Sequence, residues 1–369
     1  MFNLITLVLS VAYFIFILFF IINWNKTTDF KKELDNSFSI FISVIIAARN
    51  EENNIKALLK SIKNQNLPDK NFEVIIIDDF STDNTYKIAN NFCEKYNNFN
   101  IFRLNENYGK KNAIKKAISI SKGQLIITTD ADCMVNKTWL STIISFYQKY
   151  KPKMIIAPVL QSTNTVFSKI QALDFLSLIS SAAASCMAKK PILSNGANLI
   201  YEKNTFLEFN NPLNDSISSG DDIFLMLNIK KKYPNDILFL KSTDAVVSTK
   251  PESNFKNFIA QRKRWASKSG NYKDKDIIIS SILVFSINLF LFINLFLFFL
   301  NSKFLISFFT ILLVKTLIDF IFLYKTSSFF NQRKLLWYIL PTEIFNVLII
   351  PYLAISGVFG NTKWKGRVI

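Results

Sequence analysis

The sequence contains no histidine. Catalysis by Ser-His-Asp or Cys-His arrangements is therefore excluded, and so is zinc held by imidazole. Carboxylates remain as the general bases available near neutral pH. The three cysteines, Cys93, Cys133 and Cys186, show no metal-ligand spacing, and they do not indicate a disulfide framework.

Glycine is scarce, with 8 residues in 369, and neither a GxGxxG pattern nor a P-loop occurs, which argues against a dinucleotide-binding fold. Acidic residues are also outnumbered, 27 against 44 Lys and Arg, which leaves a formal charge of +17. The basic residues are scattered lysines and form no arginine-rich nucleic-acid motif, so we expect no nucleic-acid partner. The excess of basic residues instead indicates that they lie mainly on the cytoplasmic side of a membrane and bind anionic lipid or phosphate.

Long apolar runs lie towards both ends of the chain, and half of all residues are hydrophobic. Residues 4–22 are uncharged and long enough to cross a bilayer, so we expect a transmembrane helix in a segment 1–24, followed by a linker at 25–37. A cleaved signal peptide is the alternative, but the run lacks a basic start and a small-residue cleavage site. The lysines after the run place the next domain in the cytoplasm.

Three further apolar segments, at about 277–300, 304–324 and 335–357, predict membrane helices within residues 275–360, before a basic tail at 361–369. Lys315 and Asp319 have the i, i+4 spacing that lets them pair inside the membrane. The last segment contains Pro341, Glu343 and Pro351, so it can be broken or re-entrant. Four full spans would put the basic tail outside, and a re-entrant last segment would avoid that conflict; both remain open.

Residues 38–250 have the pattern of an α/β domain. Apolar, β-branched runs alternate with segments that have helical spacing, which predicts a mostly parallel sheet. The fold class expected is therefore α/β with added transmembrane helices. The predicted strands are residues 40–47, 72–77, 101–104, 125–128 and 154–159, and the predicted helices are 56–64, 84–96, 111–121 and 137–150.

The strand at 125–128 leads directly into Asp130 and Asp132. In an extended chain, side chains two residues apart share one face, and open α/β sheets bind ligands at the carboxyl ends of their strands. Two carboxylates suit Mg²⁺ or Mn²⁺, which keep positions open for substrate phosphates. Ordinary turn chemistry is the alternative for Asp-x-Asp after a strand.

Two other strand ends also carry polar groups. In the turn 47–52 (AARNEE), Asn50 can cap the next helix, or the turn can contact a base and ribose. Asp78 and Asp79 exceed what a helix cap needs, and a carboxylate there can accept hydrogen bonds from a pyrimidine or a ribose hydroxyl.

Charged residues also begin two predicted helices. Lys110 and Lys111 begin a helix, where cations are disfavoured unless an anion such as a diphosphate lies there; a solvated lysine pair is the alternative. Asp221 and Asp222 precede the apolar run 223–229, where they can form a helix cap or an acidic site.

Together these segments resemble family 2 of the inverting glycosyltransferases, which have the nucleotide-sugar-binding GT-A fold. The resemblance covers about residues 40–270, and its last motif, Gln-x-x-Arg-Trp, points to the membrane-embedded branch containing cellulose, chitin and hyaluronan synthases and ceramide-type lipid glucosyltransferases. The matching segments are AARNEE (47–52), IIIDDFSTDNT (75–85), GKKNAIKKA (109–117), TTDADC (128–133), SSGDDIFL (218–225) and QRKRW (261–265).

The resemblance implies a role for each matching position. Asp222 would be the base that deprotonates the acceptor hydroxyl, inverting the anomeric centre, and Asp221, shorter than the family's usual Glu, would support it. Lys110 would lie near the diphosphate, and Asp130 with Asp132 would handle metal and diphosphate. The residues that would line the nucleoside are Ala47, Arg49, Glu51 and Asp79.

The Gln-x-x-Arg-Trp residues, Gln261, Arg264 and Trp265, lie in a predicted interfacial stretch, 251–274. An amphipathic helix with an anchoring tryptophan explains this stretch without chemistry. The resemblance adds catalytic contacts with acceptor and diphosphate. Residues 166–190 are a further candidate interface element, and they lead to Asn195 and Gly196, where related enzymes build the acceptor pocket.

The resemblance therefore implies an integral protein of the cell or inner membrane with a cytoplasmic catalytic domain, using Mg²⁺ or Mn²⁺ and a nucleotide sugar, with a UDP-sugar expected. A lipid or lipid-linked acceptor is favoured because few helices are available to enclose a polymer channel, and because the tail at 364–367 resembles that of lipid glycosyltransferases. The alternatives are a processive polysaccharide synthase, a non-catalytic nucleotide-sugar-binding protein, and a transporter that uses the charged membrane residues.

Overall fold

The computed structural model describes residues 2–32, 40–106, 108–217, 219–359, 363–364 and 367–368. The chain divides into two compact units. The first contains Met1–Thr27, Gln161–Ala188 and Pro251–Ile369, and the second contains Thr28–Leu160 and Lys189–Lys250.

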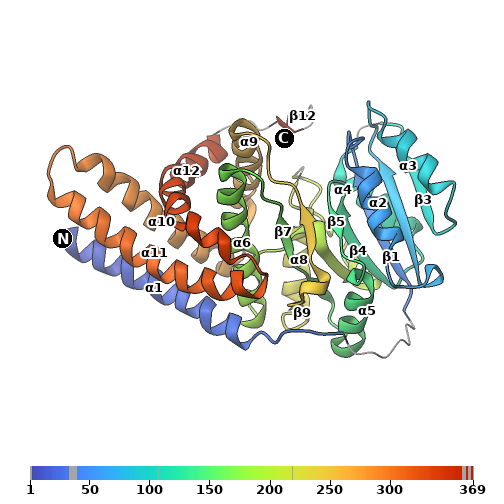
Figure 1. The fold of residues 1–369 in the computed structure, drawn as a ribbon, viewed down its shortest axis with the longest axis horizontal. Coiled ribbons are helices and arrows are strands. Elements are labelled where there is room, and N and C mark those ends of the chain that lie inside the picture. The colour runs from blue at the N-terminus through green and yellow to red at the C-terminus, as the bar shows by residue number, and fades with distance from the viewer. Residues whose placement is uncertain are drawn as a thin grey trace. The chain divides into compact units, whose positions relative to one another are not determined.

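The second unit is built on a seven-stranded sheet with strand order β3-β2-β1-β4-β8-β6-β9 (Figure 1). Strands β3, β2, β1 and β4 are parallel, whereas β8 is antiparallel to β4 and β6, so the predicted α/β class with a mostly parallel sheet is confirmed. The strands are β1 Ile42–Ala48, β2 Phe72–Asp78, β3 Phe99–Arg103, β4 Leu125–Asp130, β6 Met154–Ile156, β8 Leu199–Glu202 and β9 Ile237–Phe239.

Helices cover this sheet, and the four predicted ones are all present. Helix α3 ends three residues before its predicted end because the chain tightens there, with the N–H of Tyr96 donating to the carbonyl of Cys93 (3.0 Å). The helices are α2 Ile55–Lys63, α3 Thr85–Cys93, α4 Lys110–Ile120, α5 Trp139–Tyr150, α7 Lys203–Leu207 and α8 Asp221–Lys232. The short 3-10 helices of this unit are η1 Asp69–Asn71, η2 Gly196–Asn198 and η3 Thr243–Ala245.

The predicted strand at 154–159 is wrong in one respect, because it is two strands. β6 ends at Ile156, and β7 (Val159–Gln161) joins a separate three-stranded sheet in the order β5-β10-β7. Pro158 lies between them and has no N–H to donate to a ladder, so a sheet strand breaks there. The other members of the small sheet are β5 Met134–Val135 and β10 Val247–Thr249.

The sheet register aligns the polar strand ends that the sequence analysis singled out. Ala48 at the end of β1 is paired with Asp78 of β2, and Ala47 is paired with Asp130 of β4. The strands before these positions are almost completely buried, as expected for parallel strands covered on both faces. Three motif segments therefore meet at one edge of the sheet.

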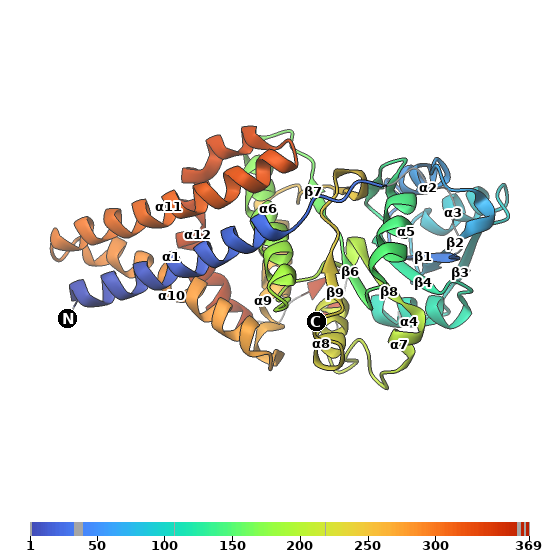
Figure 2. The ribbon, with the colours of Figure 1, turned by 90° about the horizontal axis from the view of Figure 1, so that it is seen from below.

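The first unit is helical, and α1 and α11 run side by side in both views (Figure 1, Figure 2). Its helices are α1 Phe2–Lys26, α6 Val166–Met187, α9 Phe255–Ala266, α10 Lys275–Leu297, α11 Lys303–Phe329 and α12 Ile339–Phe359, with 3-10 turns η4 Ser269–Asn271 and η5 Arg333–Tyr338. Two short strands, β11 Lys363–Trp364 and β12 Arg367–Val368, pair near the end of the chain.

Within the described residues, five helices are long and apolar enough to cross a membrane. Four of these coincide with predicted spans, and the fifth is α6, whose most apolar window is 67% buried. Helix α12 continues through Pro351 from Ile339 to Phe359, so the alternative of a broken last segment is wrong.

A buried charge cluster joins α1, α11 and α12 within the first unit. Lys315 Nζ lies 2.8 Å from Asp319 Oδ2, which confirms the predicted i, i+4 pair, and Lys315 also forms an ion pair with Glu343. The hydroxyl of Tyr13 donates to both carboxylate oxygens of Asp319, at 2.9 and 3.0 Å. All four side chains are nearly inaccessible, so each depends on the others for its polar partners.

We predict that Lys315→Met destabilises the helical unit, because it leaves Asp319 and Glu343 buried without their countercharge. Removing one partner of such a pair costs about 3–5 kcal/mol. The thermal unfolding of detergent-purified protein measures the effect, and Lys303→Met, at an exposed position of the same helix, is the control. Equal unfolding temperatures for the two variants would contradict this prediction.

Candidate active site

The first turn of α4 brings a lysine to the acidic strand ends. Lys110 Nζ lies 2.6 Å from Asp130 Oδ1 and 3.7 Å from Asp221 Oδ2. Gly109 directly before it has a φ of 93°, a conformation that glycine adopts without the strain a side chain would bring. This turn directs the ammonium of Lys110 into the space between β4 and α8.

The charge of Lys110 is held by its acidic neighbours. Burial favours the neutral amine, but the nearby carboxylates, Asp130 first and then Asp221, outweigh it and raise the pKa of Lys110 above its ordinary value. The alternative of a solvated lysine pair is therefore wrong for Lys110, since its ammonium is bound to protein carboxylates. The neighbouring Lys111 is also buried, at 6% exposure.

Gly196 lies against the same charged groups. Its N–H donates to Asp222 Oδ2 (3.2 Å), and its carbonyl accepts from the hydroxyl of Thr128 (2.9 Å). A Cβ at this position would lie 3.3 Å from Lys110 Nζ and 3.4 Å from Asp221 Oδ2. A side chain here would therefore crowd the centre of the site.

Asp222 lies in the first turn of α8 and faces Gly196. Its Oδ1 accepts from the N–H of Ile223 (2.8 Å), so one oxygen helps to satisfy the helix terminus. No side chain caps α8 at Gly220, the residue before it. One oxygen of Asp222 therefore acts as the helix cap that the alternative predicts, and the other accepts a hydrogen bond from the N–H of Gly196.

Asp79 contacts the turn that carries Lys110. Its Oδ1 accepts from the N–H of Gly109 (3.0 Å), and its carbonyl accepts from Arg49 Nη1 (2.7 Å). The strand ends of β1 and β2 are thus tied to the start of α4. Glu51 Oε2 accepts from the amide of Asn54 (2.7 Å), and Ala47 is paired with Asp130 in the sheet.

The alternative that Asn50 caps the helix after β1 is wrong, since that helix, α2, begins at Ile55 and its N-cap position is Asn54. Asn50 has a φ of 52° and its side-chain oxygen accepts from the N–H of Thr82 (2.9 Å). The turn after β1 therefore binds the turn after β2 through Asn50, and no side-chain hydrogen bond caps α2 at Asn54.

The extended spacing expected for Asp130 and Asp132 is also wrong. β4 ends at Asp130, and the N–H of Cys133 donates back to the carbonyl of Asp130 (3.1 Å), so Asp132 lies in a turn. Within the described residues, no group of three or more acidic or cysteine side chains is placed to hold a metal. The two carboxylates still fit Mg²⁺ or Mn²⁺, because these ions keep water or phosphate oxygens in their other positions.

Asn195 has a local role. Its side-chain oxygen accepts from the N–H of Ala197 (3.0 Å), which caps η2. The two residues expected to bind the sugar acceptor therefore differ in position. Gly196 lies against the charged groups, whereas the side chain of Asn195 caps the short helix that contains Gly196.

The Gln-x-x-Arg-Trp residues lie on α9 in the first unit. Gln261 donates to Glu252 Oε1 (2.7 Å), and Arg262 Nη2 lies 2.5 Å from Asp174 Oδ2 of α6. The guanidinium of Arg262 also lies over the ring of Trp265, 4.5 Å from its centroid. The ring of Trp265 lies 6.4 Å from that of Phe175 on α6, and α9, which also carries Arg264, packs against α12. The catalytic contacts that the resemblance implies for these residues stay a prediction.

Sequence reasoning missed the contacts of Asn198, Thr128 and Lys111, although Thr128 lies in the motif 128–133 and Lys111 was expected at a helix start. Asn198 is fully buried: its amide donates to the carbonyls of Pro158 and Ala245 (2.9 Å each), and its oxygen accepts from Trp139 Nε1 (3.0 Å). Nothing local in the sequence predicts the contacts of Asn198 or Thr128, because their partners are distant in the chain. The burial of Lys111 could have been predicted, since it precedes the buried Ile114 and Ile118 by three and seven residues, the spacing of one helix face.

The second unit is thus an α/β domain whose polar strand ends lie at one edge of a mostly parallel sheet. Residues 43–209 match the family described as Glycosyl transferase family 2. A mannosyltransferase from Pyrobaculum calidifontis, solved with GDP-Man and Mn²⁺, superposes over 94% of this chain and 99% of its own, with a TM-score of 0.59 and 14% identity. That likeness supports the GT-A fold.

Two curated relatives match part of the chain. A beta-monoglucosyldiacylglycerol synthase from Nostoc sp. is 32% identical over 128 residues, which are 34% of this chain and 27% of the relative. A poly-beta-1,6-N-acetyl-D-glucosamine synthase from Staphylococcus epidermidis is 28% identical over 162 residues, 43% of this chain and 37% of the relative. The chain therefore spans well under half the length of these relatives.

We predict that Lys110→Met lowers the stability of the protein by about 1 kcal/mol at pH 8. Without the ammonium, the carboxylates that surround it repel one another. In the wild-type protein the raised pKa of Lys110 keeps the ammonium charged at this pH, so its contribution is lost only in alkaline solution.

Thermal unfolding at pH 8 measures this loss, with Lys116→Met on the exposed face of α4 as the control. Addition of Mn²⁺ should restore part of the lost stability, because a cation replaces the ammonium among the carboxylates. If Mn²⁺ raises the unfolding temperature of Lys110→Met no more than that of the wild-type protein, charge repulsion is not the cause of the loss.

Proposed function

We propose that this protein is a membrane-bound inverting glycosyltransferase that moves a sugar from a nucleotide donor, a UDP-sugar, to a lipid or lipid-linked acceptor. The observation that supports this most is the contact of Lys110 with Asp130 and Asp221, beside the bond between Gly196 and Asp222. These residues come from β4, α4, η2 and α8. The family match over residues 43–209 supports the same reaction class.

In this proposal the donor lies along the carboxyl edge of β1, β2 and β4. Asp79 and the turn at Arg49 and Glu51 line the nucleoside, and Lys110 faces the diphosphate. Asp130 and Asp132 would hold Mg²⁺ or Mn²⁺, which would neutralise charge that develops on the leaving diphosphate. The contact between Lys110 and Asp130 supports this arrangement, because one site then contains both a cation for the phosphates and a carboxylate for the metal.

Asp222 would accept the proton of the acceptor hydroxyl. Its Oδ2 is held by the N–H of Gly196, so the carboxylate has a defined position next to the donor groups. As the hydroxyl oxygen bonds to the anomeric carbon, the bond from that carbon to the diphosphate oxygen breaks and the nucleoside diphosphate leaves. Asp221, which lies 3.7 Å from Lys110, would hold that cation in place.

A lipid acceptor is favoured by the five candidate membrane helices in the described part of the chain and by the Nostoc relative, which is named as a synthase of a glucosyldiacylglycerol. Gln261, Arg264 and Trp265 of α9 would contact the acceptor at the membrane surface, with the catalytic domain in the cytoplasm. A processive polysaccharide synthase is the second candidate, supported by the Staphylococcus epidermidis relative. Label from a radioactive nucleotide sugar would enter organic solvent in the first case and high-mass polymer in the second.

We predict that Asp222→Asn lowers sugar transfer by about 100-fold or more while nucleotide binding is nearly unchanged. The amide cannot accept the acceptor proton, and general-base help of this kind is worth roughly 10²–10⁴-fold. Transfer assays with membranes and isothermal titration with UDP measure the two effects. Asp244→Asn, an exposed acid of the same unit, is the control, and wild-type transfer by Asp222→Asn would remove the base assignment.

We also predict that Asp130→Ala makes UDP binding insensitive to Mn²⁺. The wild-type protein should bind UDP more tightly with Mn²⁺ than with EDTA, because the metal joins the carboxylate to the phosphates. Titration with UDP in the two buffers measures the difference. A metal effect in Asp130→Ala as large as in the wild-type protein would exclude Asp130 as a metal ligand.

A further inference from the structure

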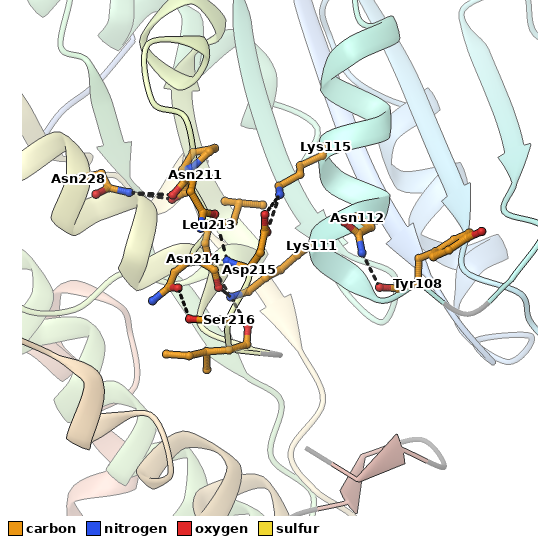
Figure 3. Close-up of polar contacts among 12 residues, drawn as sticks. Tyr108, Lys111, Asn112, Lys115, Asn211, Leu213, Asn214, Asp215, Ser216 and Asn228 are labelled. Atoms are coloured by element: carbon orange, nitrogen blue, oxygen red, sulfur yellow. Dashed lines mark hydrogen bonds and ion pairs between the residues drawn. The ribbon is translucent and has the colours of Figure 1, made fainter.

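The segment Asn211–Ile217, called here the 211–217 loop, leads into Asp221 and Asp222 and is held by a buried lysine of α4. Lys111 Nζ donates to the carbonyls of Leu213 (2.6 Å), Asn214 (2.8 Å) and Ile217 (2.6 Å). An ammonium group has three donors, so all three are used by main-chain oxygens of one loop. Figure 3 shows Lys111 reaching from α4 to this loop.

The loop has a shape that needs a cation at its centre. Three carbonyl oxygens converge on one point, and their dipoles repel one another unless a positive charge lies between them. Asn214 has a φ of 56°, a left-handed conformation, and its carbonyl accepts from the same ammonium as the other two. Lys111 is 6% exposed, so water does not replace it easily.

Three further contacts join the same elements. The ammonium of Lys111 lies 5.2 Å from the ring centroid of Phe224 on α8, and Asn228 of α8 donates to the carbonyl of Pro212 (3.1 Å). Lys115, one turn after Lys111, forms an ion pair with Asp215. The start of α4, the 211–217 loop and α8 are therefore tied together within one unit.

Consecutive residues of α4 thus reach the two sides of the candidate site. Lys110 contacts Asp130 and Asp221, and Lys111 holds the loop that leads into Asp221 and Asp222. A rotation or shift of the first turn of α4 moves both ammonium groups at once. The start of α4 therefore sets the distance between the groups that bind the sugar donor and the base, Asp222.

We propose that Lys111 is a positioning residue that places Asp222 relative to the donor-binding groups, acting through the 211–217 loop. It contacts none of the reacting atoms. The effect of Lys111 on catalysis rests on the proposed function, whereas its hydrogen bonds to the 211–217 loop do not depend on that function. Lys111→Met removes the charge and the donors and keeps an unbranched side chain that is one atom shorter.

The first measurement needs no substrate. Amide hydrogen exchange of the purified full chain, followed by mass spectrometry, should be faster in Lys111→Met at residues 211–222 and unchanged in β1, β2 and β4. Lys116→Met, at an exposed position of the same helix, should match the wild-type protein throughout. Unchanged exchange at 211–222 in Lys111→Met would overturn the proposal.

The second measurement separates positioning from loss of stability. For Lys111→Met we expect a UDP dissociation constant within about twofold of wild type and a kcat for transfer lowered by about tenfold or more, since small misplacements of reacting groups are costly in rate. Ile62→Ala, which opens a cavity in the buried face of α2, is the destabilised control. Assays run well below both unfolding temperatures should leave its kcat unchanged.

The outcomes distinguish the possible failures. If Lys111→Met has faster exchange but a wild-type kcat, the loop does not position the base and the proposal is wrong. If the wild-type protein itself transfers no sugar, the proposed function fails, and the exchange data still decide whether Lys111 holds the loop. Should Lys111→Met not accumulate as folded protein, Lys111→Gln keeps an amide donor without charge and should show the same changes to a smaller extent.

Discussion

Repulsion among carboxylates is the constraint that organises the catalytic unit. Asp130, Asp221 and Asp222 are brought to one place by a strand end and a helix start, and like charges at short range destabilise a folded state unless a cation separates them. Lys110 supplies that cation, and its attraction to the same carboxylates raises the pKa of Lys110. The chain is strongly basic as a whole, yet its candidate site is acidic.

The amino-terminal end of α4 meets this constraint in an unusual way. Positive side chains at a helix start oppose the helix dipole, so two consecutive lysines there need compensation. Lys110 obtains it from two carboxylates and Lys111 from three carbonyls. The cost of the two cations at the helix start is offset by contacts that also bring α8 and the 211–217 loop against α4.

The features of the fold that depend on local sequence pattern were predicted correctly. The parallel strands and their helices were found because apolar periodicity is a local property, and the acidic strand ends followed from the register of a parallel sheet. The antiparallel β8, the pairing of Lys315 with Glu343 and the carbonyl partners of Lys111 were not predicted, because each joins segments that are far apart in the chain. The extended spacing of Asp130 and Asp132 failed because the chain turns directly after β4.

The charge of the site also explains why a metal belongs to the proposed reaction. Four carboxylates, Asp130, Asp132, Asp221 and Asp222, carry more negative charge than the ammonium of Lys110 offsets, and a nucleotide diphosphate brings further negative charge. A divalent cation, which binds phosphate and carboxylate oxygens together, would allow an anion to approach such a site. Donor and metal would then enter together, and after the diphosphate departs the original balance of charge would return once Asp222 releases the proton that it took from the acceptor.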